Sequence, residues 1–130
     1  MATITRTFAD LDLNFTAHPV TKDITMRYDE NAVKTSLKNL ILTSNYERPF
    51  HSEIGTPIKR LLFEQSGPMT DSLIKQAIID TVNNFEPRVV LMDVTCRSPQ
   101  DTNSVYVSIT FRIVNTQRPL NLNIVLERTR

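Results

Sequence analysis

The sequence predicts an α+β domain in which about three helices pack on an antiparallel, three-stranded C-terminal meander, with an extended N-terminal arm in front. Apolar residues recur every three to four positions between residues 29 and 85, which is the spacing of amphipathic helices. After residue 88 they alternate with polar residues, which is the spacing of strands. Helices followed by strands along one chain are typical of the α+β class, whose helices cover the apolar face of the sheet.

The composition is that of one globular domain. The 130 residues are enough for a single hydrophobic core, and 40% apolar and 22% charged residues are ordinary values. Fifteen basic and 14 acidic residues leave a net charge of +1, without the basic balance of a nucleic-acid binder. No stretch approaches the roughly 20 apolar residues that span a bilayer, and the N-terminus lacks the order of a secretory signal. We therefore expect neither nucleic acid nor a membrane as a partner.

Residues 1–28 have the weakest pattern, and we predict that they form the extended arm. Residues 3–8 and 21–28 resemble short strands, but the segment between them contains Asp and Asn, which are poor strand formers. Three apolar side chains could anchor the arm on the core or on a neighbour: Leu11, Leu13 and Phe15. The single α+β domain is then expected to span residues 29–130.

The first helix is predicted to begin at Asp29, a favoured N-cap residue, and to run to about Thr43. One apolar stripe should face the core: Val33, Leu37, Leu40 and Ile41. The second helix is short, with Thr56 as its cap, Pro57 at the first helical position and an end near Gln65. Its apolar side chains are Ile58, Leu61 and Leu62, with Phe63 as a further candidate.

The third helix is predicted to have Thr70 as its cap and Asp71 in its first turn, where the helix dipole favours a carboxylate. Its stripe consists of Leu73 or Ile74, Ala77 or Ile78, Val82 and Phe85. A proline disfavours helical geometry in the residue before it, so Glu86 should close this helix. Pro87 cannot continue the helix, and Arg88 then opens the first strand.

Three strands complete the chain. The first should place Val90, Met92, Val94 and Cys96 on one face; the second spans residues 105–113. The third alternates four apolar residues with polar ones: Leu120, Leu122, Ile124 and Leu126. Short links between them predict a meander, which has two edges. Because the last strand is long and has no internal proline, its outer row of N–H and C=O groups is a template for a further strand.

The sequence offers little for catalysis or for a cofactor. It has two histidines, one cysteine, and no CxxC, HExxH or glycine-rich phosphate motif, so we expect no cofactor and no metal. Cys96 falls in a strand pattern, which favours a buried structural thiol over a nucleophile. A carboxylate pair for glycoside hydrolysis could come from Glu53, Glu64 and Glu86. However, a general acid needs a raised pKa, and the adjacent Arg88 would lower the pKa of Glu86.

Two motifs resemble a known family. Residues 47–64 read ERPFHSEIGTPIKRLLFE, and residues 85–88 read FEPR. Both are similar to signatures of the baseplate wedge, or sheath-initiator, family of contractile phage tails, which also occurs in type VI secretion baseplates and has carried a lysozyme-like label. The matching signature residues are Arg48, Pro49, Phe50, Gly55, Leu61, Leu62, Phe63 and Glu64. Residues 51–55 depart from the Pro-Glu-Phe-Gly of many members.

The resemblance implies a non-enzymatic structural protein of the virion tail baseplate, assembled in the host cytoplasm, that joins wedge proteins to the tail sheath. Six copies would ring the tail tube, whose tube or tube-initiator proteins are further candidate partners. Glu86, Pro87 and Arg88 would dock on a helical bundle of wedge proteins. Sheath subunits would add strands at the edge that holds Leu120, Leu122, Ile124 and Leu126, and so begin sheath polymerisation. The alternative is a peptidoglycan-degrading, lysozyme-like enzyme of the tail.

Overall fold

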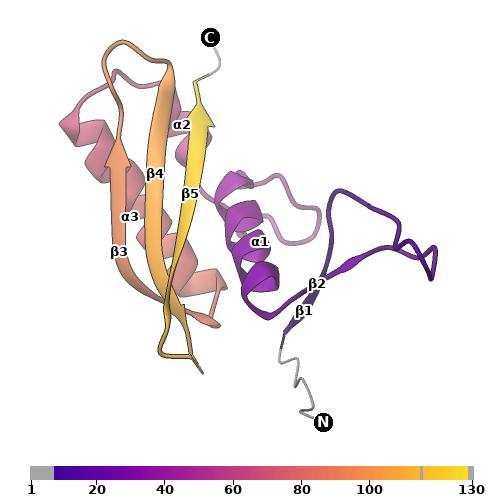
Figure 1. Ribbon diagram of the computed structural model, residues 1–130. Helices are drawn as coiled ribbons and strands as arrows, with labels where there is room; N and C mark the ends of the chain where they lie inside the picture. The colour runs from indigo at the N-terminus through magenta and orange to yellow at the C-terminus, as the bar shows by residue number, and fades with distance from the viewer. Residues whose placement is uncertain (1–7, 115, 129–130) are drawn as a thin grey trace. The chain divides into compact units, whose positions relative to one another are not determined.

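The computed structural model describes residues 8–114 and 116–128. Figure 1 shows the order of the elements along the chain. The chain divides into two compact units, Met1–Ser36 and Leu37–Arg130, and the boundary lies inside the first helix, α1 (Asp29–Leu42). This helix begins at Asp29, as predicted, and buries Val33, Leu37 and Ile41.

Two short strands form a hairpin in the first unit. Strand β1 (Ala9–Leu11) pairs antiparallel with β2 (Met26–Tyr28). The described part of the predicted arm is therefore a hydrogen-bonded hairpin, while most of the strand expected over residues 3–8 lies outside the described residues. The expected anchors Leu11, Leu13 and Phe15 are at least half exposed, so the described structure does not use them as core anchors.

A buried aspartate holds the hairpin instead. Asp12 is 5% exposed, and its carboxylate accepts hydrogen bonds from Thr16 Oγ1 at 2.9 Å and from the Asn14 N–H at 3.3 Å. Arg27 Nε lies 3.4 Å from the same carboxylate. The Thr16 hydroxyl, the Asn14 amide and the Arg27 charge together lower the pKa of Asp12, with Thr16 contributing most.

Helix α2 (Ile58–Leu62) belongs to the second unit and is shorter than predicted. Its cap is Pro57, because the Thr56 hydroxyl donates to the Ile41 carbonyl at 2.9 Å rather than to an N–H of α2. The predicted end near Gln65 is wrong, since the next two amides bond to carbonyls only three residues back, which closes the helix in a tight turn. Phe63 falls beyond that end and is 73% exposed.

Helix α3 (Pro68–Phe85) begins two residues before its predicted cap. Gly67 is the N-cap and Pro68 takes the first helical position, so Thr70 lies within the first turn and donates to the Gln65 carbonyl at 2.7 Å. The helix ends at Phe85 with Glu86 as its C-cap, as predicted. Its buried stripe includes Ile74, Ile78 and Val82, while Leu73 remains 43% exposed.

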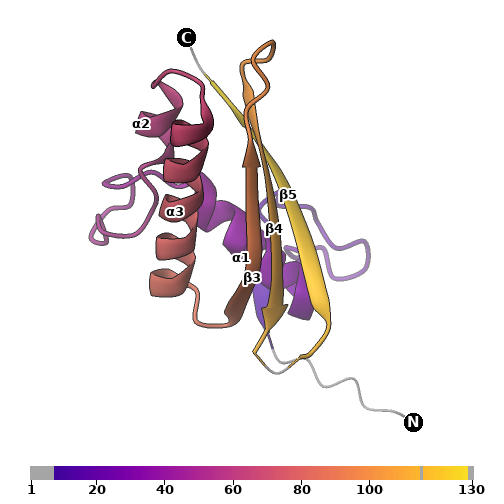
Figure 2. The same cartoon turned by 90° about the vertical axis from the view of Figure 1, so that its left-hand side faces the viewer.

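The sheet of the second unit is the predicted antiparallel meander. It contains β3 (Val89–Arg97), β4 (Ser104–Ile113) and β5 (Pro119–Glu127) in the order β3-β4-β5. Helix α3 covers one face of the sheet (Figure 2). The central strand supplies that face with five side chains that are at most 4% exposed: Val105, Val107, Ile109, Phe111 and Ile113.

The predicted faces of β3 are wrong, because the strand contains a β-bulge. Leu91 pairs with Phe111 and Asp93 with Thr110, which leaves Met92 as an extra residue. The extra residue reverses the alternation, so Val89 lies on the same face as Val94, while Met92 is 59% exposed. Val90 and Met92 therefore do not share the face of Val94 and Cys96.

Helix α3 is bound to β3 at both of its ends. At its start, Asp71 accepts hydrogen bonds from the backbone N–H of Ser98 at 3.3 Å and from the Ser98 hydroxyl at 2.5 Å. At its other end, Arg88 and Glu86 form an ion pair across Pro87. These contacts fix the position of the helix along the strand that follows it.

Candidate functional site

The Glu86-Pro87-Arg88 motif forms a closed corner between α3 and β3. Arg88 Nε donates to Glu86 Oε1 at 2.7 Å, and Arg88 Nη2 donates to Glu86 Oε2 at 3.0 Å. This is the two-point geometry in which a guanidinium binds a carboxylate most strongly. The Arg88 carbonyl also accepts from the Val114 amide at 3.0 Å, so the corner is tied to the end of β4.

The two charges of the motif are unequally accessible. The Glu86 side chain is 5% exposed and the Arg88 side chain 27% exposed. From the sequence, both charges are expected to face a partner, whereas in the structure they form one internal ion pair. Arg88 is the more accessible member of the pair.

The predicted signature residues fall into an exposed loop and a partly buried helix. Arg48, Pro49 and Phe50 are exposed, and Phe50 is fully so, at a positive φ of 65°. In α2, Leu61 is 7% exposed. Leu62 is half-buried, and Phe63 and Glu64, just past the helix, are exposed. The signature therefore combines residues that support the fold with residues that remain on the surface.

Gly55 in this signature is required by the backbone around it. Its φ is +140°, a region that other residues rarely adopt. A Cβ atom there would lie 2.7 Å from the backbone of Ser44 and 2.9 Å from the Thr43 carbonyl oxygen. The close approach lets the Thr56 N–H bond to the Thr43 carbonyl at 2.9 Å.

Strand β5 is an edge strand, and its hydrogen-bond register shows which residues face outward. Directly opposite residues in an antiparallel pair alternate between bonded and non-bonded. The Arg128 amide bonds to the Asn103 carbonyl at 2.7 Å, so these two residues form a bonded pair. Every second pair back along β5 from Arg128 is therefore also a bonded pair. The residues of β5 in those pairs point their N–H and C=O groups toward β4: Leu120, Leu122, Ile124 and Leu126.

The outward row of β5 is the alternate set: Asn121, Asn123, Val125 and Glu127. Two observations agree with this register. Pro119, which has no N–H, also falls in a non-bonded pair, with Arg112. Thr110 Oγ1 donates to Asn121 Oδ1 at 2.7 Å, as expected where side chains of a non-bonded pair approach closely. The four apolar residues named from the sequence lie on this edge strand, but their N–H and C=O groups point toward β4, and their neighbours present the edge.

The opposite edge of the sheet is interrupted. Strand β3 contains the Met92 bulge, and bulges are one of the devices that block pairing at a sheet edge. Strand β5 pairs with β4 without a register shift from Pro119 to Glu127. The continuous edge is therefore that of β5.

The carboxylates considered for hydrolysis lack the environment of a general acid. Glu53 is 63% exposed; its own backbone N–H, and then His51 at 3.4 Å, lower its pKa. Glu86 is held by Arg88. Burial raises the pKa of the Cys96 thiol to about 11, as for a structural cysteine rather than a nucleophile.

The described residues contain neither a candidate metal centre nor a membrane-spanning helix. Within residues 8–114 and 116–128, no three His, Cys, Asp or Glu side chains cluster as metal ligands would. In the same part of the chain, no helix has the length and apolarity of a membrane span.

The second unit thus combines a continuous open sheet edge, a feature that can accept a strand of another protein, with an ion-paired helix–strand corner. The chain belongs to the baseplate wedge protein gp25 family, whose model matches residues 27–118. It is a structural component of a contractile tail baseplate, located in the virion tail and assembled in the host cytoplasm, and it associates with other baseplate components.

Individual relatives agree with this family. The baseplate wedge protein gp25 of Enterobacteria phage T4 is 29% identical over 115 residues, which cover 88% of this chain and 86% of the relative. A Geobacter sulfurreducens protein described as a tail lysozyme has a TM-score of 0.69 at 23% identity, over 75% of this chain and 89% of its own. A chain of the anti-feeding prophage baseplate has a TM-score of 0.65 at 19% identity, and the match covers 95% of this chain and 87% of that chain. At these identities the two solved structures share the fold.

Proposed function

We propose that this protein joins wedge proteins to the tail sheath and begins sheath polymerisation by accepting a strand of a sheath subunit at the edge of β5. The observation that carries the proposal is the outward row of Asn121, Asn123, Val125 and Glu127 on a strand that pairs on one side only. In strand addition, the backbone hydrogen bonds supply affinity and the side-chain pockets supply specificity.

The β5 edge has few of the features that natural proteins use to block such pairing. It is nine residues long, its only proline is the first residue, and it carries no bulge. Its only charged residue is Glu127, at its end. An edge of this kind is a liability in a free protein and is useful in a protein whose partner completes the sheet.

We propose that the Glu86-Pro87-Arg88 corner is the second contact, with a helical bundle of wedge proteins. The corner is rigid, because the ion pair and Pro87 fix it, and Arg88 is partly accessible. A fixed guanidinium suits docking, since less side-chain freedom is lost on binding. Six copies around the tail tube, with contacts to tube or tube-initiator proteins, complete the proposed arrangement.

We also propose that the protein is not an enzyme. Hydrolysis of a glycoside would require a carboxylic acid with a raised pKa opposite a second carboxylate. The pKa of Glu53 is lowered and Glu86 is bound to Arg88. The likeness to a protein described as a tail lysozyme is one of fold and supplies no catalytic pair.

A pair of variants at Asn123 tests strand addition. Asn123→Pro removes one outward N–H and leaves the bonds between β5 and β4 in place, whereas Asn123→Ala keeps that N–H. Baseplates assembled with the proline variant should carry little sheath, and those with the alanine variant should carry normal sheath, as counted by electron microscopy. Normal sheath on baseplates with the proline variant would contradict strand addition at β5.

A further inference from the structure

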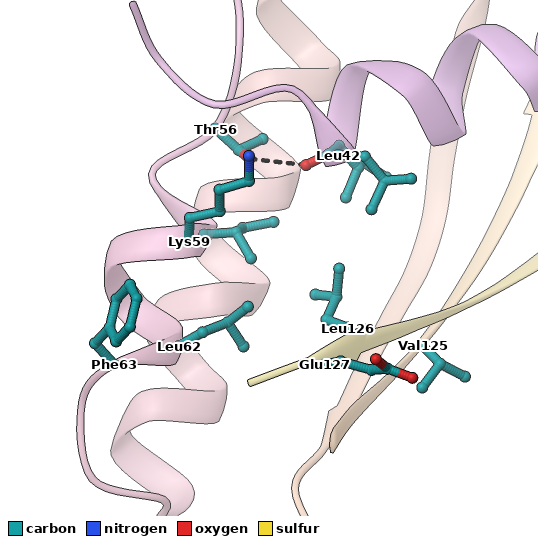
Figure 3. A pocket seen from close by; sticks show the side chains of 10 residues that line it. Leu42, Thr56, Lys59, Leu62, Phe63, Val125, Leu126 and Glu127 are labelled. Carbon is teal, nitrogen blue, oxygen red and sulfur yellow. Dashed lines mark hydrogen bonds between the residues drawn. The ribbon is translucent and has the colours of Figure 1, made fainter. Parts of the chain in front are cut away.

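A groove in the second unit opens beside the C-terminal half of β5. It has a volume of about 190 Å³ and lies between α2, the end of α1 and β5. Figure 3 shows Leu42, Leu62 and Leu126 around this space, with Phe63, just past the end of α2, farther out. Leu42 is 42% exposed and Phe63 73% exposed, so the groove leaves apolar surface open to solvent.

The groove is continuous with the proposed strand-addition edge. Val125 and Glu127 line it and also point their N–H and C=O groups outward. A strand added to β5 would lie about 4.8 Å away, with side chains that alternate between the two faces. The residue that comes beside Leu126 would lie on the same face as Leu126 and would therefore enter the groove.

We propose that the strand that pairs with β5 inserts one large apolar side chain into this groove, beside Leu126. The inference rests on the proposed function and adds the chemistry of the partner. The volume matches one such side chain, because an apolar cavity of about 150 Å³ can hold a benzene molecule. Backbone pairing would set the register, and the groove would select the residue at one position of the partner.

The electrostatics of the groove favour an apolar occupant over a charged one. Lys59 is the one basic residue of its lining, and its ammonium lies 3.7 Å from the Glu47 carboxylate, so its charge is compensated within the chain. Glu127 lies at the end of β5 and would repel an acidic residue. The Thr56 hydroxyl donates to the Ile41 carbonyl at 2.9 Å and is not directed to a ligand.

Sheath formation on baseplates reconstituted with the full-length chain and purified sheath subunits tests this proposal. Leu42→Gln and Phe63→Gln each remove an exposed apolar wall of the groove. Met69→Gln is the matched control, since Met69 is an apolar residue of α3 that is 79% exposed and does not line the groove. Burial of one large apolar side chain contributes about 1.5–3 kcal/mol, which corresponds to roughly tenfold to 100-fold in affinity. We expect each groove variant to need at least about tenfold more sheath subunit for half-maximal sheath formation, and Met69→Gln to match the unmodified protein.

The outcomes separate the groove from the edge. If Asn123→Pro prevents sheath formation while both groove variants behave as the unmodified protein, strand addition stands and the inserted side chain is refuted. If Asn123→Pro has no effect, both proposals fail, even where a groove variant lowers sheath formation. A benzophenone side chain at position 63 gives a second readout. It should crosslink to an apolar residue within an alternating segment of the sheath subunit, and a crosslink to a helix would overturn the proposal.

Discussion

Arg88 and Glu86 form a two-point ion pair across Pro87, with donor–acceptor distances of 2.7 and 3.0 Å. The pair closes the corner between α3 and β3 and buries the Glu86 carboxylate almost completely. The motif therefore supports the fold, and experiments on its proposed docking role must separate that role from its effect on stability.

Removal of the guanidinium should destabilise the protein. Arg88→Ala leaves a buried carboxylate without its ion-pair partner, and we expect the free energy of unfolding to fall by about 1–3 kcal/mol, less than for a fully buried pair because Arg88 is partly exposed. Arg88→Lys should be intermediate, since an ammonium cannot form the two-point contact. Urea denaturation measures the free energy of unfolding of both variants. Arg60→Ala, at an exposed arginine of α2, is the control and should change the free energy of unfolding by less than about 0.5 kcal/mol. An Arg88→Ala variant as stable as this control would contradict a structural role for the pair.

Of two substitutions within the signature loop, one should destabilise the protein and the other should leave its stability unchanged. Gly55→Ala places a Cβ atom 2.7 Å from the Ser44 backbone at a φ of +140°. This substitution should lower the free energy of unfolding by about 2 kcal/mol or more. Phe50→Ala removes a side chain that is fully exposed and should leave the free energy of unfolding within about 0.5 kcal/mol of the original. Thermal unfolding of the two variants gives the comparison. A neutral Gly55→Ala would mean that the loop does not pass so close to residues 43–44.

The hairpin of the first unit should depend on the charge of Asp12. The pKa of Asp12 is lowered in the folded protein, so its contribution to stability is fully present above the unfolded value of about 3.9. That contribution is lost as the pH falls through the folded pKa. Amide exchange at Thr25, whose N–H bonds to the Thr16 carbonyl, should therefore accelerate, relative to an unstructured peptide, as the medium is acidified below about pH 4. Asp12→Asn should remove this dependence, and an unchanged acid response in that variant would assign it to another group.

Purified protein should not degrade peptidoglycan. A general acid requires a pKa raised by burial. Glu53 and Glu64 are exposed, the pKa of Glu53 is lowered, and Glu86 is ion-paired with Arg88. Zymography with the full-length chain should give no cleared band. A cleared band that disappears in a Glu→Gln variant of one of these three residues would instead support the lysozyme-like alternative.

Local signals in the sequence were sufficient for the order of the three helices and of the three C-terminal strands. The start of α1 at Asp29, the end of α3 before Pro87 and the three-strand meander follow from capping, from proline and from a change in periodicity. These features depend on neighbouring residues, so one sequence contains enough information to predict them.

Features that depend on distant partners could not be predicted in the same way. Thr56 suits a cap, but it bonds to Ile41 because the chain returns to that carbonyl in three dimensions. The Met92 bulge depends on how β3 pairs with β4, and the outward row of β5 depends on which residue pair starts the ladder. The burial of Glu86 likewise depends on packing around the corner.

Hydrogen exchange at the β5 amides is the most direct test of the central claim. In free protein, the amides of Asn121, Asn123, Val125 and Glu127 should exchange fast, and those of Leu122 and Ile124, which bond to β4, should exchange slowly. In baseplates that carry sheath, labelled intact and then dissociated for measurement, the four outward amides should become protected by at least tenfold. Equal exchange of these four amides with and without sheath would contradict strand addition at β5.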